Sequence, residues 1–298
     1  MTQNPEKTIQ PRVAVIGTGT MGSAMTARLL GSGLEVGVWS RHPASTGRSI
    51  ELGATGYAEA ADAVAAADVV VTMLPTLDAT KEVMFDAKTL EAMRPDATWA
   101  QMATIGVAAT ESLYTEASAR RPDVIFVDAP VSGSREPAES GQLLILASGA
   151  EPATGMLEPV FDALGKTTMW LGPVGAGSRM KLVLNTWLAF QTEGAAESSA
   201  LAERLGVDAG LLLEALHDSP LASGYAMAKL KRMIAQDYQA DFSLDWALKD
   251  LELVASDAGG DTAPIAIAIA DRWRDLVQGG ASGLDVSAAR LGLGSASQ

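Results

Sequence analysis

Lys181 and Asn185 are the residues of this sequence whose types and spacing are best suited to chemistry. They lie in an apolar stretch whose hydrophobic members are Met180, Leu182, Val183, Leu184, Trp187, Leu188 and Phe190. Apolar residues on nearly every side of a predicted helix indicate burial, and burying an ammonium group is costly unless a partner or an altered pKa compensates. Residues four apart share a helical face. The pair therefore predicts a polar site in an apolar wall, with Lys181 as a proton donor. The alternative is a lysine whose stem packs while its head reaches water, beside a satisfied core amide.

A glycine-rich turn near the N-terminus indicates phosphate binding. The β-branched run Arg12 to Ile16 precedes Gly17-Thr18-Gly19-Thr20-Met21-Gly22, and a helical pattern follows from Met21 to Leu30. In this setting the first glycine makes the tight turn, the second lets a pyrophosphate approach the backbone, and the third lets helix and strand pack closely. The helix N-terminus then faces the phosphates. We predict that residues 17–22 bind a dinucleotide; glycines of an ordinary loop are the alternative.

The next predicted strand, Glu35 to Trp39, ends at Ser40, Arg41 and His42. A dinucleotide site for NAD places a carboxylate here, on the adenosine ribose. Serine followed by arginine suits the 2′-phosphate of NADP instead, because a guanidinium group forks onto phosphate oxygens that a carboxylate would repel. The sequence thus predicts NADPH as cofactor, and Arg48 could assist. A solvated surface loop is the alternative.

Strand and helix patterns continue to alternate through residue 171. Further strands are expected at Val69–Thr72, Thr98–Met102, Val124–Asp128, Leu143–Ala147 and Thr168–Leu171, and helices near 59–67, 80–85, 109–120 and 152–163. This alternation favours a mostly parallel, doubly wound sheet. Ligands of such sheets bind beyond the carboxyl ends of the strands. We therefore expect four residues to contact cofactor or substrate, although each could equally serve its turn: Leu74, Pro75, Thr104 and Ser132.

The pattern changes after Gly172, because no convincing strand follows. Helical patterns occupy 178–205, 209–217, 226–236, 244–258, 264–277 and a short piece from 285. We predict the α/β class, with an N-terminal doubly wound Rossmann domain that binds NADP over residues 1–173. An all-α C-terminal domain for substrate binding and oligomerisation is expected over residues 174–298. The natural site would be the cleft between these domains.

The composition narrows the function classes. With 36 acidic and 22 basic residues the net charge is −14, so nucleic acid and anionic membranes are poor partners. The absence of cysteine and the presence of only two histidines leave little material for metal sites or Ser/His/Asp hydrolysis, and no metal is expected. The polar first ten residues lack a signal-peptide core, and no stretch suits a membrane span. We expect a soluble, cytoplasmic protein with a small-molecule substrate.

Four segments together resemble the β-hydroxyacid dehydrogenase family, which is related to 3-hydroxyisobutyrate dehydrogenase. They are Gly17-Thr-Gly-Thr-Met-Gly22-Ser-Ala-Met25, Asp128-Ala-Pro-Val-Ser-Gly133, Gly175-Ala-Gly-Ser-Arg-Met-Lys181-Leu-Val-Leu-Asn185 and Lys249-Asp250. Their order and spacing cover nearly the whole chain, which is more specific than any single motif. Within the family, Pro130 to Glu139 and Lys181 to Asn185 look most like the glyoxylate/succinic semialdehyde reductase branch.

The resemblance implies an NADP-dependent oxidoreductase of the EC 1.1.1 type. It would reduce a short carboxylated aldehyde, or oxidise the corresponding hydroxyacid, with Lys181 as the acid/base residue. Ser132 and Gly133 would hold the substrate carboxylate, and Asn185 would orient the substrate. Members of the family form dimers or tetramers, so a homodimer or homotetramer is expected. The resemblance also implies contacts with the nicotinamide cofactor from two residues, Thr104 and Lys249.

Two departures from the family pattern bear on the substrate. Leu184 replaces the first member of an Asn pair, which makes the 3-hydroxyisobutyrate branch less favoured. Ser134 and Arg135 follow Ser132 and Gly133 where many members have another glycine, and an extra cation there could change substrate preference. Imine reductases share the fold but generally lack the lysine, and a chromatin-associated relative that lost it serves as a binding module. Lys181 argues against both alternatives.

Overall fold

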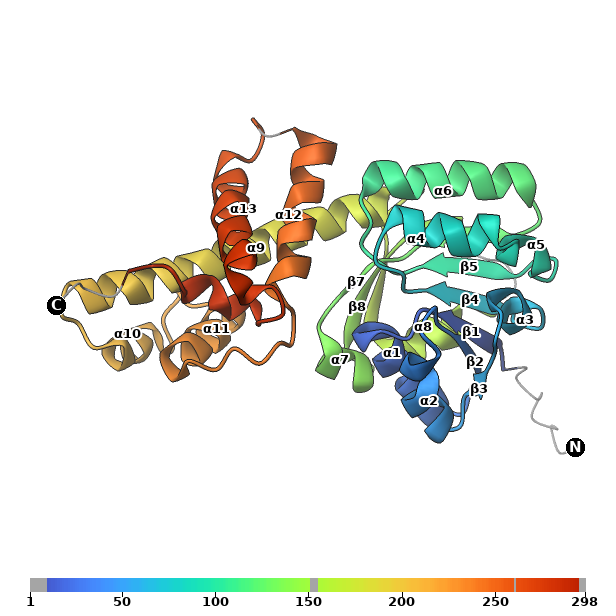
Figure 1. Cartoon of the computed structure of the whole chain (residues 1–298), viewed down its shortest axis with the longest axis horizontal. Helices are drawn as coiled ribbons and strands as arrows, with labels where there is room; N and C mark the ends of the chain where they lie inside the picture. Colours follow the sequence, from blue (N-terminus) through green and yellow to red (C-terminus); the bar gives the residue numbers. More distant parts are fainter. Residues whose placement is uncertain (1–9, 151–154, 260, 295–298) are drawn as a thin grey trace, which may run out of the picture. The chain divides into compact units, whose positions relative to one another are not determined.

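The computed structural model describes residues 10–150, 155–259 and 261–294 (Figure 1). The chain forms two compact units, Met1–Lys181 and Leu182–Gln298, which divide within one long helix, α9, Ala176–Arg204. The domain boundary expected between residues 173 and 174 stays a prediction. The polar residues 1–9 and the expected start of a helix at Pro152 lie outside the described residues.

Unit 1 is built on a sheet in the order β3-β2-β1-β4-β5-β6-β8-β7, with β9 beside β8. The strands are β1 Arg12–Ile16, β2 Glu35–Trp39, β3 Thr55–Gly56, β4 Val69–Thr72, β5 Thr98–Gln101, β6 Ile125–Asp128, β7 Val131–Ser132, β8 Leu143–Gly149 and β9 Gly165–Trp170. Pairing is parallel from β3 to β6, whereas β8 runs antiparallel to β6 and β7. The expected fold class, a Rossmann-like sheet followed by helices, is confirmed.

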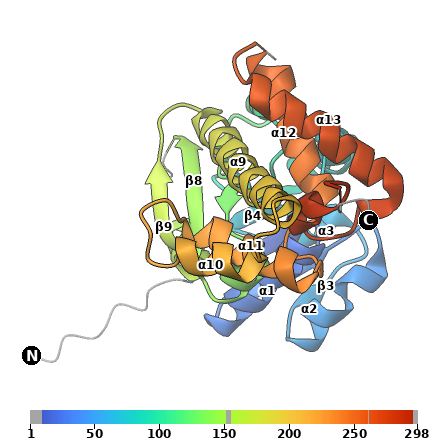
Figure 2. The same ribbon diagram turned by 90° about the vertical axis from the view of Figure 1, so that its left-hand side faces the viewer.

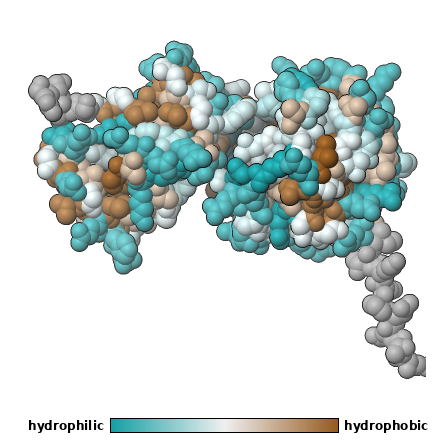
Figure 3. Space-filling model, turned by 60° about the horizontal axis from the view of Figure 1, so that its bottom comes forward, coloured by the Kyte–Doolittle hydropathy of each residue, from teal (hydrophilic) through white to brown (hydrophobic). Residues whose placement is uncertain are grey.

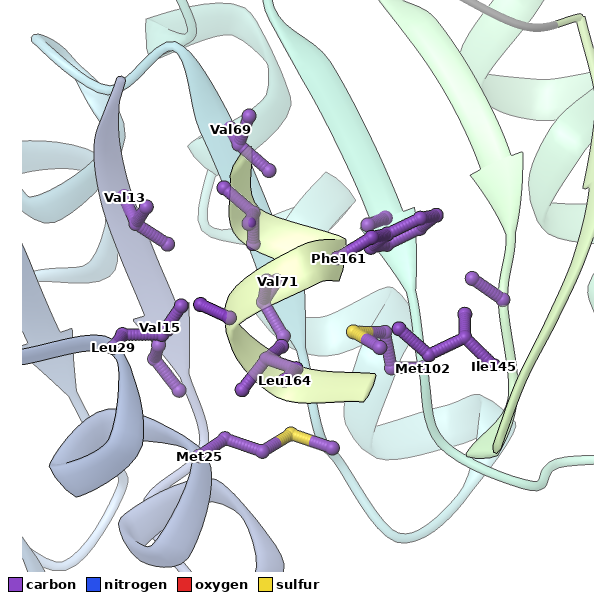
Figure 4. Close-up of a cluster of buried hydrophobic side chains, with 14 of the residues drawn as sticks. Val13, Val15, Met25, Leu29, Val69, Val71, Met102, Ile145, Phe161 and Leu164 are labelled. Carbon is purple, nitrogen blue, oxygen red and sulfur yellow. The ribbon is translucent and has the colours of Figure 1, made fainter. Parts of the chain in front are cut away.

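Alternate residues of the central strands enter two separate hydrophobic cores. Val13 and Val15 of β1 belong to the core on one face of the sheet, shown in Figure 4. Ala14 and Ile16 belong to the core on the other face. Successive side chains of a strand point to opposite faces, so a strand covered on both sides needs an unbroken apolar run. This explains why β1 could be predicted residue for residue.

Helices cover both faces of this sheet (Figure 1). They are α1 Thr20–Gly31, η1 Pro43–Thr46, α2 Gly47–Glu51, α3 Ala60–Val64, α4 Leu77–Lys81, η2 Glu82–Asp86, α5 Thr89–Ala92, α6 Val107–Arg120, α7 Arg135–Glu139 and α8 Glu158–Leu164. The helix expected over residues 80–85 begins earlier, because the Thr76 hydroxyl accepts the Ala79 N–H as an N-cap. The two-residue strand β7 and the single-turn helix α7 are too short to produce a periodic pattern.

Unit 2 is all helix among its described residues (Figure 2). After α9 come α10 Ala209–Leu216, α11 Gly224–Ala235, α12 Leu244–Ala258, α13 Pro264–Leu276, η3 Val277–Ala281 and η4 Val286–Arg290. Helices α12 and α13 lie side by side, and Trp273 is fully buried in the core of this unit. Glu193 of α9 accepts hydrogen bonds from Arg272 and from the Trp273 indole N–H at 2.8 Å. In the described part of the chain, none of the helices has the length and apolar character needed to cross a membrane.

Helix α9 corrects one expectation from the sequence. Leu182 is buried, but Val183 and Trp187 are 64% and 62% exposed, so burial on nearly every side of this helix is wrong for the single chain. The buried stripe in unit 2 repeats every three to four residues and consists mainly of small and polar side chains: Asn185, Ala189, Thr192, Glu193, Ala196 and Ser199. Small residues let a helix approach its neighbours closely, and the larger side chains of Val183 and Trp187 remain on the exposed side.

Candidate active site

The carboxyl ends of β2, β1, β4 and β5 form one edge of the sheet. Backbone hydrogen bonds tie the segments that leave these strands: Gly17 N–H to Trp39 O at 2.8 Å, Met73 N–H to Ile16 O at 2.9 Å and Met102 N–H to Thr72 O at 3.1 Å. Parallel neighbours end at the same edge. The structure therefore brings together four sets of sequence-predicted residues in unit 1: Gly17 to Gly22, Ser40 and Arg41, Leu74 and Pro75, and Thr104.

The glycine turn fits a dinucleotide pyrophosphate. Gly17 has φ +99°, and a Cβ atom there would stand 2.6 Å from the carbonyl oxygen of Met73. A Cβ atom at Gly22 would stand 1.9 Å from the Gly17 oxygen, so this glycine is needed for close packing of α1. A Cβ atom at Gly19 would meet nothing within 4 Å, and no side chain caps α1. The first turn of α1 thus has no capping side chain and has open space beside Gly19, which suits phosphate binding at a helix N-terminus.

A buried polar network supports the loop that carries Thr104. The Trp99 indole N–H donates to the Thr72 hydroxyl at 2.9 Å, which donates to the Gln101 Oε1 atom at 2.9 Å. The Gln101 amide then donates to the Ala103 oxygen at 2.7 Å. Each of these polar side chains is satisfied in the core, which fixes the path of the chain directly before half-buried Thr104. Polar residues within apolar strands are visible in the sequence, but the sequence does not show which of them form hydrogen bonds with one another.

The arginines expected near the ribose phosphate are exposed and have acidic partners. Arg41 Nη2 lies 2.9 Å from Glu82 Oε2, and Ser40 beside it is half-buried. Arg48 Nη2 lies 3.7 Å from Glu139 Oε1 on α7. Arg41 therefore stays at the carboxyl end of β2, where the sequence placed it, while Arg48 is directed toward another element.

The segment expected to hold the substrate carboxylate begins on β7. Ser132 is half-buried and pairs with Leu144 of β8, and Gly133 has φ +134°. A Cβ atom at Gly133 would lie 2.8 Å from Leu143 Cδ2, so the tight path after Ser132 requires glycine. Arg135 Nε donates to Glu139 Oε1 at 2.9 Å. The extra cation of this segment is thus paired along α7.

Asp128, at the end of β6, anchors the N-terminus of α9. Its Oδ2 atom accepts the Ser178 N–H at 2.9 Å, the Gly175 N–H at 3.2 Å and the Ser148 hydroxyl at 2.9 Å. Its Oδ1 atom accepts the Ser178 hydroxyl at 2.8 Å. Burial raises the pKa of Asp128, and the hydrogen bonds from Ser178, Ser148 and Gly175 offset this only in part. A fully buried carboxylate thus satisfies donors of the first helical turn.

Two glycines allow this close approach. Gly175 has φ +91°, a left-handed conformation that favours glycine. A Cβ atom at Gly177 would lie 2.1 Å from the carbonyl oxygen of Leu146 on β8, so no other residue fits without moving α9. Lys181 follows Ser178 by one helical turn. The Gly-x-Gly-Ser pattern before Lys181 therefore sets the position of the helix that carries the lysine. In the sequence Asp128 is visible only as the first residue of the motif Asp128 to Gly133, and its contact with α9 could not be predicted from it.

Lys181 is 9% exposed, and Asn185 on the next turn of α9 is also buried. In unit 2 the Asn185 amide donates to a carboxylate oxygen of Asp250, whose other oxygen lies 2.9 Å from Lys249 Nζ. The Lys249 ammonium also stands 5.6 Å from the Trp246 ring centroid. Asp250 was not assigned a role from the sequence. It can be noticed in the sequence as an acidic residue that lies between two leucines, Leu248 and Leu251, which are buried in α12.

Comparisons with known proteins agree with this arrangement. A family model described as the NAD binding domain of 6-phosphogluconate dehydrogenase matches residues 12–172. A second, described as NAD-binding of NADP-dependent 3-hydroxyisobutyrate dehydrogenase, matches residues 175–291. Glyoxylate/succinic semialdehyde reductase 1 of Arabidopsis thaliana is 31% identical over 279 residues, which are 93% of this chain and 96% of that protein.

Two further relatives are a dehydrogenase of known structure and a nuclear factor. The structure of Mycobacterium tuberculosis 3-hydroxyisobutyrate dehydrogenase with L-serine superposes with a TM-score of 0.86 at 29% identity, and the match covers 96% of this chain and 100% of that one. The cytokine-like nuclear factor N-PAC of Xenopus tropicalis is 30% identical over 260 residues, which are 86% of this chain and 48% of that protein.

A sheet with a glycine-rich β1–α1 turn, matched by an NAD binding domain over residues 12–172, defines an NAD(P)-binding protein. The two matched models and the reductase relative identify it further: the chain belongs to the 3-hydroxyisobutyrate dehydrogenase-like family of β-hydroxyacid dehydrogenases. The described residues contain no group of three or more histidine, aspartate or glutamate side chains arranged to hold a metal ion.

Proposed function

We propose that this chain uses NADPH to reduce a short aldehyde that carries a carboxylate, such as glyoxylate or succinic semialdehyde, to the hydroxyacid. The reverse oxidation uses the same groups. The observation that carries the proposal is the position of Lys181, which is only 9% exposed. It lies one helical turn after Ser178, whose N–H donates to Asp128 at 2.9 Å and so anchors the start of the helix. A buried and positioned ammonium suits acid/base work better than a solvated surface role.

Lys181 acts as the general acid in the proposed reduction. When bound, the nicotinamide ring supplies the hydride that reaches the carbonyl carbon. Negative charge grows on the carbonyl oxygen as this happens, and the Lys181 ammonium both stabilises the charge and donates the proton. In the reverse direction the neutral amine takes the proton from the hydroxyl group. Asn185, four residues further on the same helical face, orients the substrate, and its hydrogen bond to Asp250 fixes the direction of its amide.

The substrate carboxylate is assigned to Ser132 and Gly133. The Ser132 hydroxyl and the Gly133 N–H are donors at the end of β7 and the turn that follows, where Gly133 has a left-handed backbone conformation. The ion pair between Arg135 and Glu139 reduces the positive charge that Arg135 contributes. We therefore assign recognition of the carboxylate to hydrogen bonds from the turn rather than to this arginine.

The cofactor assignment rests on the carboxyl edge of the sheet. Gly17, Gly19, Thr20, Met21 and Gly22 hold the pyrophosphate, and Leu74, Pro75 and Thr104 line the path toward the nicotinamide. Ser40 and Arg41 select NADPH over NADH, since no carboxylate directly follows β2. Lys249 is assigned a contact with the nicotinamide half of the cofactor.

The chain is proposed to form at least a homodimer. Val183 and Trp187 lie one turn apart on α9 and are more than half exposed, and α10 contains no buried residue although half of its residues are leucine. Figure 3 shows apolar residues on the surface of the helical unit. Exposed apolar surface of this extent is typical of contacts between subunits.

Steady-state oxidation of NADPH tests the substrate class. Succinic semialdehyde and butyraldehyde have chains of equal length and differ in the terminal carboxylate. Donors left unpaired by the neutral aldehyde cost about 1 to 3 kcal/mol each, so we expect the acid to have a specificity constant about tenfold higher or more. Equal efficiency with butyraldehyde, or efficient reduction of a cyclic imine, would contradict the proposal and favour an imine reductase.

A further inference from the structure

Arg41 and Glu82 form an ion pair across the cofactor edge of unit 1. Their Nη2 and Oε2 atoms are 2.9 Å apart, and the two side chains are 54% and 64% exposed. Arg41 follows β2, whereas Glu82 lies on the helix that follows β4. Because β1 lies between β2 and β4 in the sheet, this ion pair links the two segments that flank the glycine turn. No function assigned above uses Glu82.

Glu82 stands where its helix changes geometry. The α-helical turn Leu77–Lys81 widens to a π-helix that begins at Glu82 and ends at Asp86. Widened turns of this kind are rare in helices and frequent at functional sites. The neighbouring cation does not neutralise Glu82, since Lys81 pairs instead with Glu116 at 3.6 Å. The Glu82 carboxylate is therefore directed at Arg41.

The 2′-phosphate of NADPH and the Glu82 carboxylate would compete for the Arg41 guanidinium group. Phosphate is best recognised by two N–H groups of the planar guanidinium fork, and in this structure the Nη2 group of that fork is directed at Glu82. We propose that Glu82 is a cofactor-selectivity residue: it holds Arg41 in the free protein and must release it to the 2′-phosphate, which lowers the affinity for NADPH but not for NADH. This inference rests on the proposed role of Arg41 in NADPH recognition.

Equilibrium binding of NADPH and NADH to the full chain tests the inference. The two cofactors differ only in the 2′-phosphate. We expect Glu82→Gln to tighten NADPH binding about two- to fivefold, the small effect that fits an exposed ion pair, and to leave NADH unchanged. In an Arg41→Ala background the same substitution should no longer affect NADPH. Glu35→Gln is the matched control, because Glu35 forms an exposed pair with Arg12 at 3.2 Å at the opposite end of β1 and β2.

Each outcome supports or overturns the inference. Weaker or unchanged NADPH binding by Glu82→Gln overturns it, as does an equal gain in the Arg41→Ala background, which would indicate direct repulsion of the phosphate. An equal gain from Glu35→Gln would indicate a general charge effect and also overturns it. If Arg41→Ala weakens NADPH no more than NADH, the proposed cofactor recognition fails and this inference with it. If Arg41→Ala discriminates but Glu82→Gln has no effect, only the role of Glu82 fails.

Discussion

Ser178 donates two hydrogen bonds to Asp128, one from its backbone N–H at 2.9 Å and one from its hydroxyl at 2.8 Å. The residues are separated by 50 positions in the chain, and the contact joins the end of β6 to the first turn of α9. Asp128 also begins the segment that leads to Ser132. One buried carboxylate therefore positions the helix of the candidate acid/base lysine, and it lies four residues before Ser132 in the chain.

Substitutions of Asp128 should separate its hydrogen bonds from its charge. Asp128→Ala leaves the N–H groups of Gly175 and Ser178 buried without an acceptor, so we expect a loss of about 3 kcal/mol or more in the free energy of unfolding. Asparagine has nearly the same shape, and its amide can donate to the Ser178 hydroxyl, which lies 3.1 Å from Thr110 Oγ1 as an alternative acceptor. Asp128→Asn should therefore cost about 1 kcal/mol or less. Urea unfolding measures both, and equal losses would contradict the assigned hydrogen bonds.

Because the pKa of Asp128 is raised, the difference in stability between the natural protein and Asp128→Asn should depend on pH. Burial makes the folded state bind this proton more tightly than the unfolded state. The contribution of Asp128 to stability is therefore fully present below the pKa of the unfolded chain and falls as pH rises through the folded pKa. We expect the stability of the natural protein relative to Asp128→Asn to decrease over that acidic range. A difference that increases with pH there would show that the hydrogen bonds outweigh burial.

Gly177→Ala should displace α9, because its Cβ atom would be 2.1 Å from the Leu146 oxygen. We expect a loss of about 1 to 3 kcal/mol in stability from overpacking and a fall in turnover on the order of 100-fold from the shift of Lys181. Gly194→Ala is the matched control in the same helix, since its Cβ atom meets nothing within 4 Å. That change should stabilise the protein by about 0.5 to 1 kcal/mol. Thermal unfolding and steady-state kinetics check both, and normal turnover by Gly177→Ala would contradict the positioning role.

Lys181→Ala should retain NADPH binding and lose on the order of 100- to 10,000-fold in turnover, the usual contribution of a positioned acid/base group. Lys181→Arg keeps the positive charge but does not release a proton near neutral pH, so it should also be impaired. Lys166→Ala removes an exposed lysine of the same unit and should behave as the natural protein. Near-normal turnover by Lys181→Ala would identify Lys181 as a structural lysine.

The buried pair of Lys229 and Asp285 should control the acid stability of unit 2. Nζ lies 2.8 Å from Oδ1. Burial raises the pKa of Asp285, but hydrogen bonds from Lys229 and the Ser287 N–H outweigh it and leave the pKa below its ordinary value. This contribution is present above the unfolded pKa and is lost as pH falls through the folded pKa.

Asp285→Asn should cost about 3 to 5 kcal/mol at neutral pH, because it leaves a buried ammonium without its carboxylate. The difference from the natural protein should shrink as the solution is acidified. Asp271→Asn removes an exposed partner of Arg274 and should cost about 1 kcal/mol or less. Urea unfolding over a pH series measures this difference in the free energy of unfolding. A difference that grows as the pH falls would contradict a lowered pKa of Asp285.

Trp187 provides a test of self-association. We expect the natural protein to sediment as a dimer or larger species, and Trp187→Ser to shift the equilibrium toward monomers, because this 62% exposed indole loses its apolar contact. Trp170→Ser changes another exposed tryptophan, on β9 of unit 1, and should leave the species unchanged. A monomeric natural protein in analytical ultracentrifugation would contradict the proposed dimer.

Local sequence determined the elements that depend on short-range patterns. The bounds of β1, β2 and β4 follow directly from runs of four or five residues rich in apolar and β-branched side chains, because both faces of these strands are covered. The glycine turn could also be predicted, since the conformation of Gly17 and the close packing of Gly22 depend on residues next to them in the chain or on the adjacent strand end. The lysine was visible because its charge contradicts its apolar neighbours.

Tertiary structure decided what stands opposite these residues. The partners of Ser178, Asn185 and Arg41 lie 50, 65 and 41 positions away, and no periodicity encodes which distant carboxylate a given donor meets. The burial of α9 could not be predicted either, because composition shows how apolar a helix is but not which of its sides has a neighbour within the chain. The sequence by itself thus determined the fold class and the residues capable of chemistry. Only the packing of strand ends and helices placed the carboxylates of Asp128, Asp250 and Glu82 beside their partners Ser178, Asn185 and Arg41.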